Sequence, residues 1–147
     1  MPEPRQPDEL PARADFPVWR AMPTRWADND QYGHANNVVY YSWFDTAVNG
    51  WLIEASGCDI RALPAIGLVV QTSCRYLAEL RFPEVVTAGI GLERLGTSSV
   101  IYRLALFGAG DAPAAVGRFV HVYVDRAGRR PAPVPPQIRA ALDRLRA

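Results

Sequence analysis

The sequence predicts an α+β fold, in which one long helix covers a curled antiparallel sheet of about five strands. Two observations carry this prediction. Residues 38–56 bear apolar side chains at steps of three and four, a spacing that is typical of a buried helix. Downstream, four strand-like segments follow one another with no helix between them. Because strands joined by short turns run antiparallel, we expect an antiparallel sheet and not a doubly wound one.

The composition of the chain changes near residue 16. Residues 1–15 combine four prolines with charged side chains, so we expect a disordered N-terminal tail. The remaining residues, 16–147, are expected to form a single domain, because 147 residues lie within the size range of one domain. Its first element is a predicted strand within 16–26, where Pro23 indicates an edge or a bulge.

The long helix carries end signals in the sequence. Asn36 or Asn37 can supply an N-cap side chain, and Gly57 stands where a left-handed C-terminal residue is expected. Apolar residues such as Val38 and Leu52 lie outside the main stripe and complete the circumference. This pattern predicts a helix that is buried on more than one side.

The second half of the chain reads as strands followed by a short helix. The expected strands are 68–77, 85–94, 98–107 and 114–125, with turns at 95–97 and 108–111. A proline-rich segment then leads into a C-terminal helix over 137–146. The edges of such a sheet need covering or pairing, and pairing with a second copy of the chain is an economical solution.

Charge and hydropathy exclude several classes of protein. The 16 basic residues are all arginine and balance 15 acidic ones to a net charge of +1, which argues against a nucleic-acid partner. The lack of lysine removes Schiff-base chemistry and the P-loop. With no run of 18 apolar residues and no signal peptide, we expect a cytoplasmic protein without a membrane partner.

Motifs for cofactors and metals are missing as well. The chain has no Walker A sequence, no G-x-S-x-G, and no dinucleotide fingerprint with its third glycine. His34 and His121 have no sequence neighbour at metal-ligand spacing. The sequence therefore predicts no cofactor and no metal site.

A polar loop over residues 25–37 remains as the candidate for chemistry. It places Asp28, Asp30 and His34 directly before the long helix, whose first N–H groups lack intrahelical acceptors and carry partial positive charge. Such a helix start beside a cleft can stabilise an oxyanion, and a nearby carboxylate can act as nucleophile or general base. The same residues can instead simply cap the helix and stabilise turns, and spacing alone leaves both interpretations open.

The segment RWADNDQYGHANNVVYYSWFDTA resembles the D-x-D-x-x-G-H-x-N-N signature of hotdog-fold acyl-CoA thioesterases of the 4-hydroxybenzoyl-CoA thioesterase type. The resemblance extends over about residues 18–138. It implies a hotdog fold, with a central helix wrapped by the sheet. It also implies a homodimer, or a dimer of dimers (a homotetramer), with the acyl-CoA site at the subunit interface.

The resemblance also implies roles for individual residues. By its place in the motif, Asp30 is the catalytic carboxylate, and the backbone N–H of Asn37 polarises the thioester carbonyl. His34 and Asn36 are implied to orient water, the carbonyl or the loop itself. Tyr32 and Gly33, within the same motif, are assigned to contact with the substrate and coenzyme A.

Two further predictions concern Asp28, the first aspartate of the motif, and two arginines far from it in the chain. Asp28 is expected to hold the loop through hydrogen bonds to backbone N–H groups. Arg129 and Arg130 follow the last strand and are candidates for the phosphates of coenzyme A, with a solvated charged loop as the alternative.

The resemblance thus implies hydrolysis of an acyl-CoA thioester to a free acid and coenzyme A, with no cofactor. An acyl-carrier-protein thioesterase and a non-catalytic acyl-CoA-binding module are the alternatives. The presence of Asp30 argues against the second, because binding alone needs no such carboxylate. The acyl group depends on the shape of the pocket, which the sequence does not reveal.

Overall fold

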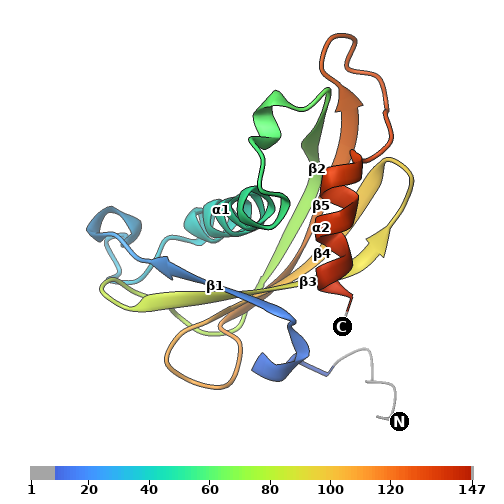
Figure 1. Cartoon of the computed structure of the whole chain (residues 1–147). Helices are drawn as coiled ribbons and strands as arrows, with labels where there is room; N and C mark the ends of the chain where they lie inside the picture. The colour runs from blue at the N-terminus through green and yellow to red at the C-terminus, as the bar shows by residue number, and fades with distance from the viewer. Residues whose placement is uncertain (1–8, 147) are drawn as a thin grey trace.

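A five-stranded antiparallel sheet curls around one long helix in the computed structural model, which describes residues 9–146 (Figure 1). The sheet has the order β1-β3-β4-β5-β2. Its strands are β1 (Val18–Pro23), β2 (Ala65–Tyr76), β3 (Val85–Leu95), β4 (Ser99–Phe107) and β5 (Ala115–Asp125). The predicted α+β class, with a helix wrapped by about five antiparallel strands, is confirmed, and the expected strands lie close to the observed ones.

Helix α1 (Asn37–Ser56) begins and ends where the cap signals indicate. The Asn36 side chain accepts a hydrogen bond from the Val38 N–H at 3.0 Å, so Asn36 is the N-cap. Gly57 takes the left-handed conformation, with φ of 68°, and its N–H donates to the Ile53 carbonyl. The capped helix therefore has a well-defined start, which is the feature that the candidate site depends on.

The prediction that α1 is buried all around is wrong for the single chain. The sheet covers one side of the helix, and the buried residues on that side are Tyr40, Trp43, Phe44, Ala47, Val48, Trp51 and Leu52. On the other side Val38 is 66% exposed and Ile53 is 45% exposed. Apolar residues occur on exposed as well as buried helix faces, so apolar composition alone does not show which side of the helix the sheet covers.

The sheet bends sharply enough to bring its strands against α1. β-Bulges interrupt the register between Val69 and Gln71 in β2 and between Leu92 and Arg94 in β3, and bulges increase the local bend of a strand. Gly117 in β5 allows a close approach, since an added methyl group would lie 2.5 Å from the ring of Phe44 on α1.

The C-terminal helix α2 (Pro136–Leu142) is shorter than the predicted 137–146, because residues 143–145 tighten into a 3₁₀ turn. Ile138 and Leu142 of α2 are fully buried in the main core. Figure 1 shows α2 lying across the sheet near the end of α1. This helix thereby closes one end of the space between α1 and the sheet.

The N-terminal prediction needs a correction at its boundary. Arg13–Asp15 form a 3₁₀ turn, and the Arg13 guanidinium donates to the Gly108 carbonyl at 2.7 Å and lies 4.8 Å from the Phe107 ring centroid. These contacts order the chain before residue 16, because a docked guanidinium ties the segment to the turn after β4. The rest of the expected tail, residues 1–8, lies outside the described residues.

Within residues 9–146, no helix is both long and apolar enough to cross a membrane.

Candidate active site

The polar loop before α1 is held in place by its own buried carboxylate. Asp28 is 1% exposed and accepts hydrogen bonds from the Arg25 N–H at 2.7 Å and from the Arg25 guanidinium at 3.0 Å. The backbone carbonyl of Asp28 accepts a hydrogen bond from the Asn36 N–H at 2.9 Å. These contacts confirm the predicted role of Asp28, which ties the two ends of the loop together.

A second set of contacts fastens the loop to the segment that follows β2. The Asn29 side chain accepts a hydrogen bond from the Phe82 N–H at 3.0 Å. The Ala35 N–H donates to the Leu80 carbonyl at 2.7 Å. The loop is thus clamped on both sides of Asp30, which limits how far that side chain can move.

Asp30 stands at the start of a tight turn. Its carboxylate accepts a hydrogen bond from the Tyr32 N–H at 2.8 Å, and its backbone N–H donates to the His34 carbonyl at 3.0 Å. Gly33, with φ of 84°, takes the left-handed conformation that this turn requires. Asp30 is half-buried, so the carboxylate is both restrained and accessible to a ligand.

A cavity of about 360 Å³ opens beside this turn. It is lined by Asp30, His34, Ala35, Asn37, Tyr40, Tyr76, Leu77, Ala78 and Glu79. The structure therefore brings together three of the predicted catalytic residues, namely Asp30, His34 and Asn37. It adds the end of β2 and residues 77–79 as a wall that sequence reasoning missed.

The start of α1 borders this cavity through Asn37. Two of its first N–H groups are engaged by the cap, because Val38 donates to the Asn36 side chain and Val39 to the Asn36 carbonyl. The N–H of Asn37 is the first of the helix and has no intrahelical acceptor by its position. Asn36 therefore acts as the cap, while Asn37 presents the backbone donor.

The wall opposite the turn is aromatic and acidic. The Tyr76 hydroxyl donates to the Asn37 carbonyl at 2.7 Å, and its ring packs edge-on against Tyr40 at 4.9 Å between centroids. Burial raises the pKa of both Tyr40 and Tyr76, so both hydroxyls stay protonated at neutral pH.

A carboxylate oxygen of Glu79 lies 3.5 Å from Nε2 of His34, beside the imidazole ring. His34 is thereby oriented by Glu79, a residue that no sequence motif marks.

The other predicted residues lie outside this cavity. Tyr32, 74% exposed, stacks on the His34 ring at the tip of the loop, next to Gly33. Arg129 and Arg130 lie in the exposed turn after β5, where the Arg129 N–H and the Arg130 carbonyl are bonded to the backbone of Asp125. Within one chain, Arg129 and Arg130 are thus not brought to Asp30.

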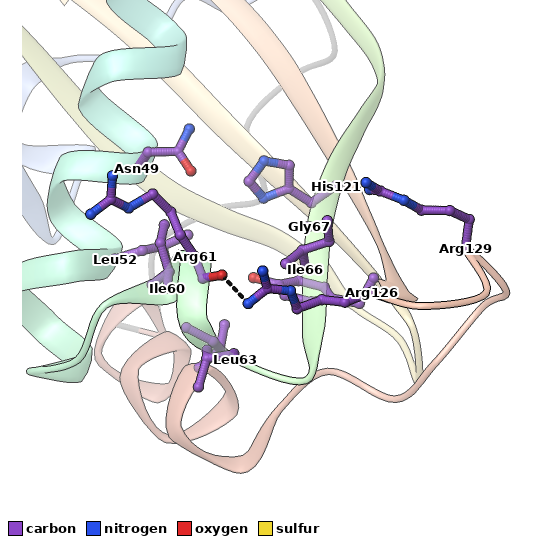
Figure 2. A pocket seen from close by; sticks show the side chains of 12 residues that line it. Asn49, Leu52, Ile60, Arg61, Leu63, Ile66, Gly67, His121, Arg126 and Arg129 are labelled. Carbon is purple, nitrogen blue, oxygen red and sulfur yellow. Dashed lines mark hydrogen bonds between the residues drawn. The ribbon is translucent and has the colours of Figure 1, made fainter.

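A separate cavity of about 280 Å³ lies between the C-terminal half of α1 and the sheet (Figure 2). It is lined in part by Asn49, His121 and Arg129, and it shares no lining residue with the cavity beside Asp30. His121 is 2% exposed, and its Nδ1 has no hydrogen-bond partner among the described residues. Burial lowers the pKa of His121 to about 4, so its imidazole is neutral at pH 7.

Metal ligation finds no support in the placement of the usual ligand side chains. Across residues 9–146, no group of three or more His, Cys, Asp or Glu side chains is positioned to hold a metal ion.

Known proteins share this architecture. A family model described as the thioesterase-like superfamily matches residues 24–142. The crystal structure of the PA5185 protein from Pseudomonas aeruginosa strain PAO1 superimposes with a TM-score of 0.88 at 49% identity, over 93% of this chain and 96% of that one. No curated protein sequence gives a significant match.

Two further solved structures are similar at lower identity. A thioesterase from Thermus thermophilus, solved in complex with coenzyme A and Zn, gives a TM-score of 0.73 at 29% identity, over 90% of this chain and 93% of that one. The PA2801 protein from Pseudomonas aeruginosa gives a TM-score of 0.78 at 32% identity, over 86% and 98% of the two chains. The curled sheet and central helix are shared with these structures, and the fold is the hotdog fold that the motif implied.

Proposed function

Because the chain belongs to the thioesterase-like superfamily, we propose that it hydrolyses an acyl-CoA thioester to a free acid and coenzyme A. One observation carries the proposal. A single cavity is lined by the Asp30 carboxylate and by Asn37 at the start of α1, so a base or nucleophile and an oxyanion donor face the same space. The 4-hydroxybenzoyl-CoA type remains part of the proposal and is supported by the D-x-D-x-x-G-H-x-N-N motif.

The reaction follows from this pairing. The thioester carbonyl oxygen accepts a hydrogen bond from the Asn37 N–H, which makes the carbonyl carbon more electrophilic. In one route, Asp30 takes a proton from water as that water attacks the carbon, and the tetrahedral intermediate expels the thiolate of coenzyme A. The thiolate then takes up a proton, and the acyl group leaves as the free acid.

A second route uses the same residues. Asp30 can attack the carbonyl carbon directly and expel the thiolate, forming a mixed anhydride that water then hydrolyses. Oxygen from water identifies the nucleophilic route when that water attacks the Asp30 carbon of the anhydride. In a single turnover in ¹⁸O-water, the general-base route places ¹⁸O only in the released acid. The nucleophilic route, with water attacking the acyl carbon, leaves label in the acid as well. If water attacks the Asp30 carbon, label enters Asp30.

The position of β2 supports a dimer in which two chains share each site. β2 is an edge strand, and three consecutive apolar residues in it, Leu68, Val69 and Val70, are 38–59% exposed. Edge strands with exposed apolar residues pair readily with another strand, and a second copy supplies an identical one. We therefore propose that two copies of β2 pair antiparallel about a two-fold axis near Val70.

Such pairing would also bring the arginines after β5 toward the substrate. It would place Tyr76 at the end of one β2 next to Ala65 at the start of the other β2, within a few residues of Gly67. Tyr76 lines the cavity of Asp30, and Gly67 lines that of Arg129, so the two cavities would meet across the interface. In this arrangement Arg129 and Arg130 of one chain contact the phosphates of coenzyme A bound beside Asp30 of the other. Tyr32 and Gly33 are proposed to contact the same ligand from the loop tip.

The proposal is tested with a panel of aliphatic and aromatic acyl-CoA thioesters, by measuring release of the free thiol. We expect release from at least one class, with coenzyme A and the free acid formed in equal amounts. Turnover only of thioesters carried by acyl carrier protein would contradict the assignment to coenzyme A. Tight binding of acyl-CoA without thiol release would instead indicate a non-catalytic binding module.

A further inference from the structure

The cavity between the C-terminal half of α1 and the sheet has the features of a binding site of its own. Five of its lining residues are large and apolar, namely Leu52, Ile60, Leu63, Ile66 and Ile138. The others include three arginines, and none of the lining residues is acidic. This combination provides an apolar pocket whose mouth carries positive charge.

Not all of that charge is already neutralised. Arg61 pairs with Asp59 at 2.9 Å, and Arg126 donates to the Arg61 carbonyl, so both have partners. Arg129 has no carboxylate within 4.0 Å among residues 9–146. The guanidinium groups of Arg126 and Arg129 therefore both lack an anion among these residues, and that of Arg126 is held by the Arg61 carbonyl.

The interior offers a matching polar atom. Figure 2 shows the His121 ring, which comes from β5, lying between Asn49 of α1 and the Arg129 side chain. Nδ1 of His121 is buried without a hydrogen-bond partner among the described residues, and it lies 3.1 Å from where a Cβ on Gly67 would stand. A buried nitrogen without a partner favours a ligand that can hydrogen-bond to it.

We propose that this cavity binds a small carboxylic acid with an apolar body. The carboxylate pairs with the Arg129 guanidinium and accepts a hydrogen bond from Nδ1–H of His121, while the apolar body packs on Leu52 and Ile138. A bare phosphate would leave those apolar walls uncovered, which is why the structure favours an organic acid. The inference goes beyond the proposed function, because binding of the acid needs neither a thioester nor Asp30. It assigns Arg129 to the acid when no coenzyme A is bound, whereas the proposed function assigns Arg129 to the phosphates of bound coenzyme A.

Benzoate, its neutral analogue benzamide, and inorganic phosphate are suitable probes for the full-length protein. Titration followed by amide NMR shifts and by calorimetry is expected to show saturable benzoate binding at residues around His121 and Gly67. Benzamide, which has the same shape without the charge, is expected to bind at least tenfold more weakly. Equal binding of both probes, or binding of phosphate but not benzoate, would overturn the proposal.

Variants of single residues sharpen the result. Gly67→Ala places a methyl group against His121 and Tyr123, and Arg129→Gln removes the charge, so each should weaken benzoate binding about tenfold or more. Gly110→Ala, where nothing lies within 4 Å, and Arg130→Gln, which does not line the cavity, are the matched controls and should bind as wild type. Unchanged binding by Arg129→Gln contradicts the assignment.

The outcome is independent of the hydrolase assignment. Asp30→Asn should bind benzoate as the wild type does, even if it hydrolyses nothing, since Asp30 lines the other cavity. Conversely, a protein that hydrolyses acyl-CoA but binds no benzoate would refute this inference and leave the proposed function intact. If a cavity variant unfolds, the comparison of benzoate with benzamide on the wild type still decides.

Discussion

The Tyr76 hydroxyl donates a 2.7 Å hydrogen bond to the carbonyl of Asn37, and this contact joins the end of β2 to the first turn of α1. The two residues are 39 positions apart in the chain, and both line the cavity of Asp30. The backbone donor of the candidate site is therefore held by a side chain from the opposite wall.

Replacing Tyr76 by Phe tests how much this contact stabilises the fold. The ring can keep its packing against Tyr40, so only the hydrogen bond is lost, and we expect the free energy of unfolding to fall by about 1 kcal/mol. Urea denaturation measures the difference. Tyr32→Phe serves as the matched control, because Tyr32 is 74% exposed, and should change nothing. Equal stability of wild type and Tyr76→Phe would show that the hydrogen bond has no net effect.

The role of the Asn37 backbone N–H can be tested without disrupting the helix. Proline lacks that N–H and is favoured at the first position of a helix, and Asn36 already has φ of −61° and ψ of 141°, which suits a residue before proline. We expect Asn37→Pro to lower kcat about 100- to 1000-fold while keeping the fold. Asn37→Ala retains the N–H and should keep most of the activity. If both variants lose activity equally, the side chain and not the backbone is the functional group.

The sequence predicted the local parts of this site better than its long-range parts. The N-cap at Asn36 and the loop-holding role of Asp28 depend on neighbours within about eight residues, and both appear in the structure as expected. Glu79 and Tyr76 reach the site only through the path of β2, and no motif in the sequence marks that path. Local hydrogen-bonding preferences are readable from a sequence, whereas the packing of distant segments is not.

The same distinction applies to the fold. The order of the strands along the chain and the ends of α1 followed from periodicity and caps. The exposed side of α1 at Val38 did not, because apolar residues occur on exposed as well as on buried faces. The docking of Arg13 onto Gly108 was missed because a charged, proline-rich segment resembles a disordered one in composition.

The two arginines after β5 are expected to affect substrate binding and not the chemical step. Contacts with phosphates are the same in the ground state and the transition state, so Arg129→Gln with Arg130→Gln should raise KM for acyl-CoA severalfold with kcat nearly unchanged. An acyl-pantetheine substrate, which lacks the nucleotide, is the control and should show no such effect. A similar loss with both substrates would indicate that the arginines act on the structure of the site.

Buried His121 predicts a pH-dependent stability. Its pKa is about 4 in the folded protein and 6.5 in the unfolded chain, so the unfolded state binds the proton first as the pH falls. The contribution of this group to the free energy of unfolding should therefore be constant well above pH 6.5 and decrease by about 2 kcal/mol on going to pH 5. His121→Phe removes the titration and should show a smaller decrease over the same range in urea denaturation. Identical pH profiles would show that His121 is solvated in the native state.

The central claim is that the Asp30 carboxylate drives thioester hydrolysis, and Asp30→Asn tests it most directly. Asparagine keeps a side-chain oxygen that can accept the hydrogen bond from the Tyr32 N–H, so the turn should persist while the base or nucleophile is lost. Asp111→Asn, which removes a fully exposed carboxylate, is the matched control and should remain active. The decisive measurement is kcat for thiol release from an acyl-CoA that the wild type hydrolyses. Our account predicts a decrease of about 100-fold or more in a folded Asp30→Asn protein, and a kcat close to that of the wild type would contradict it.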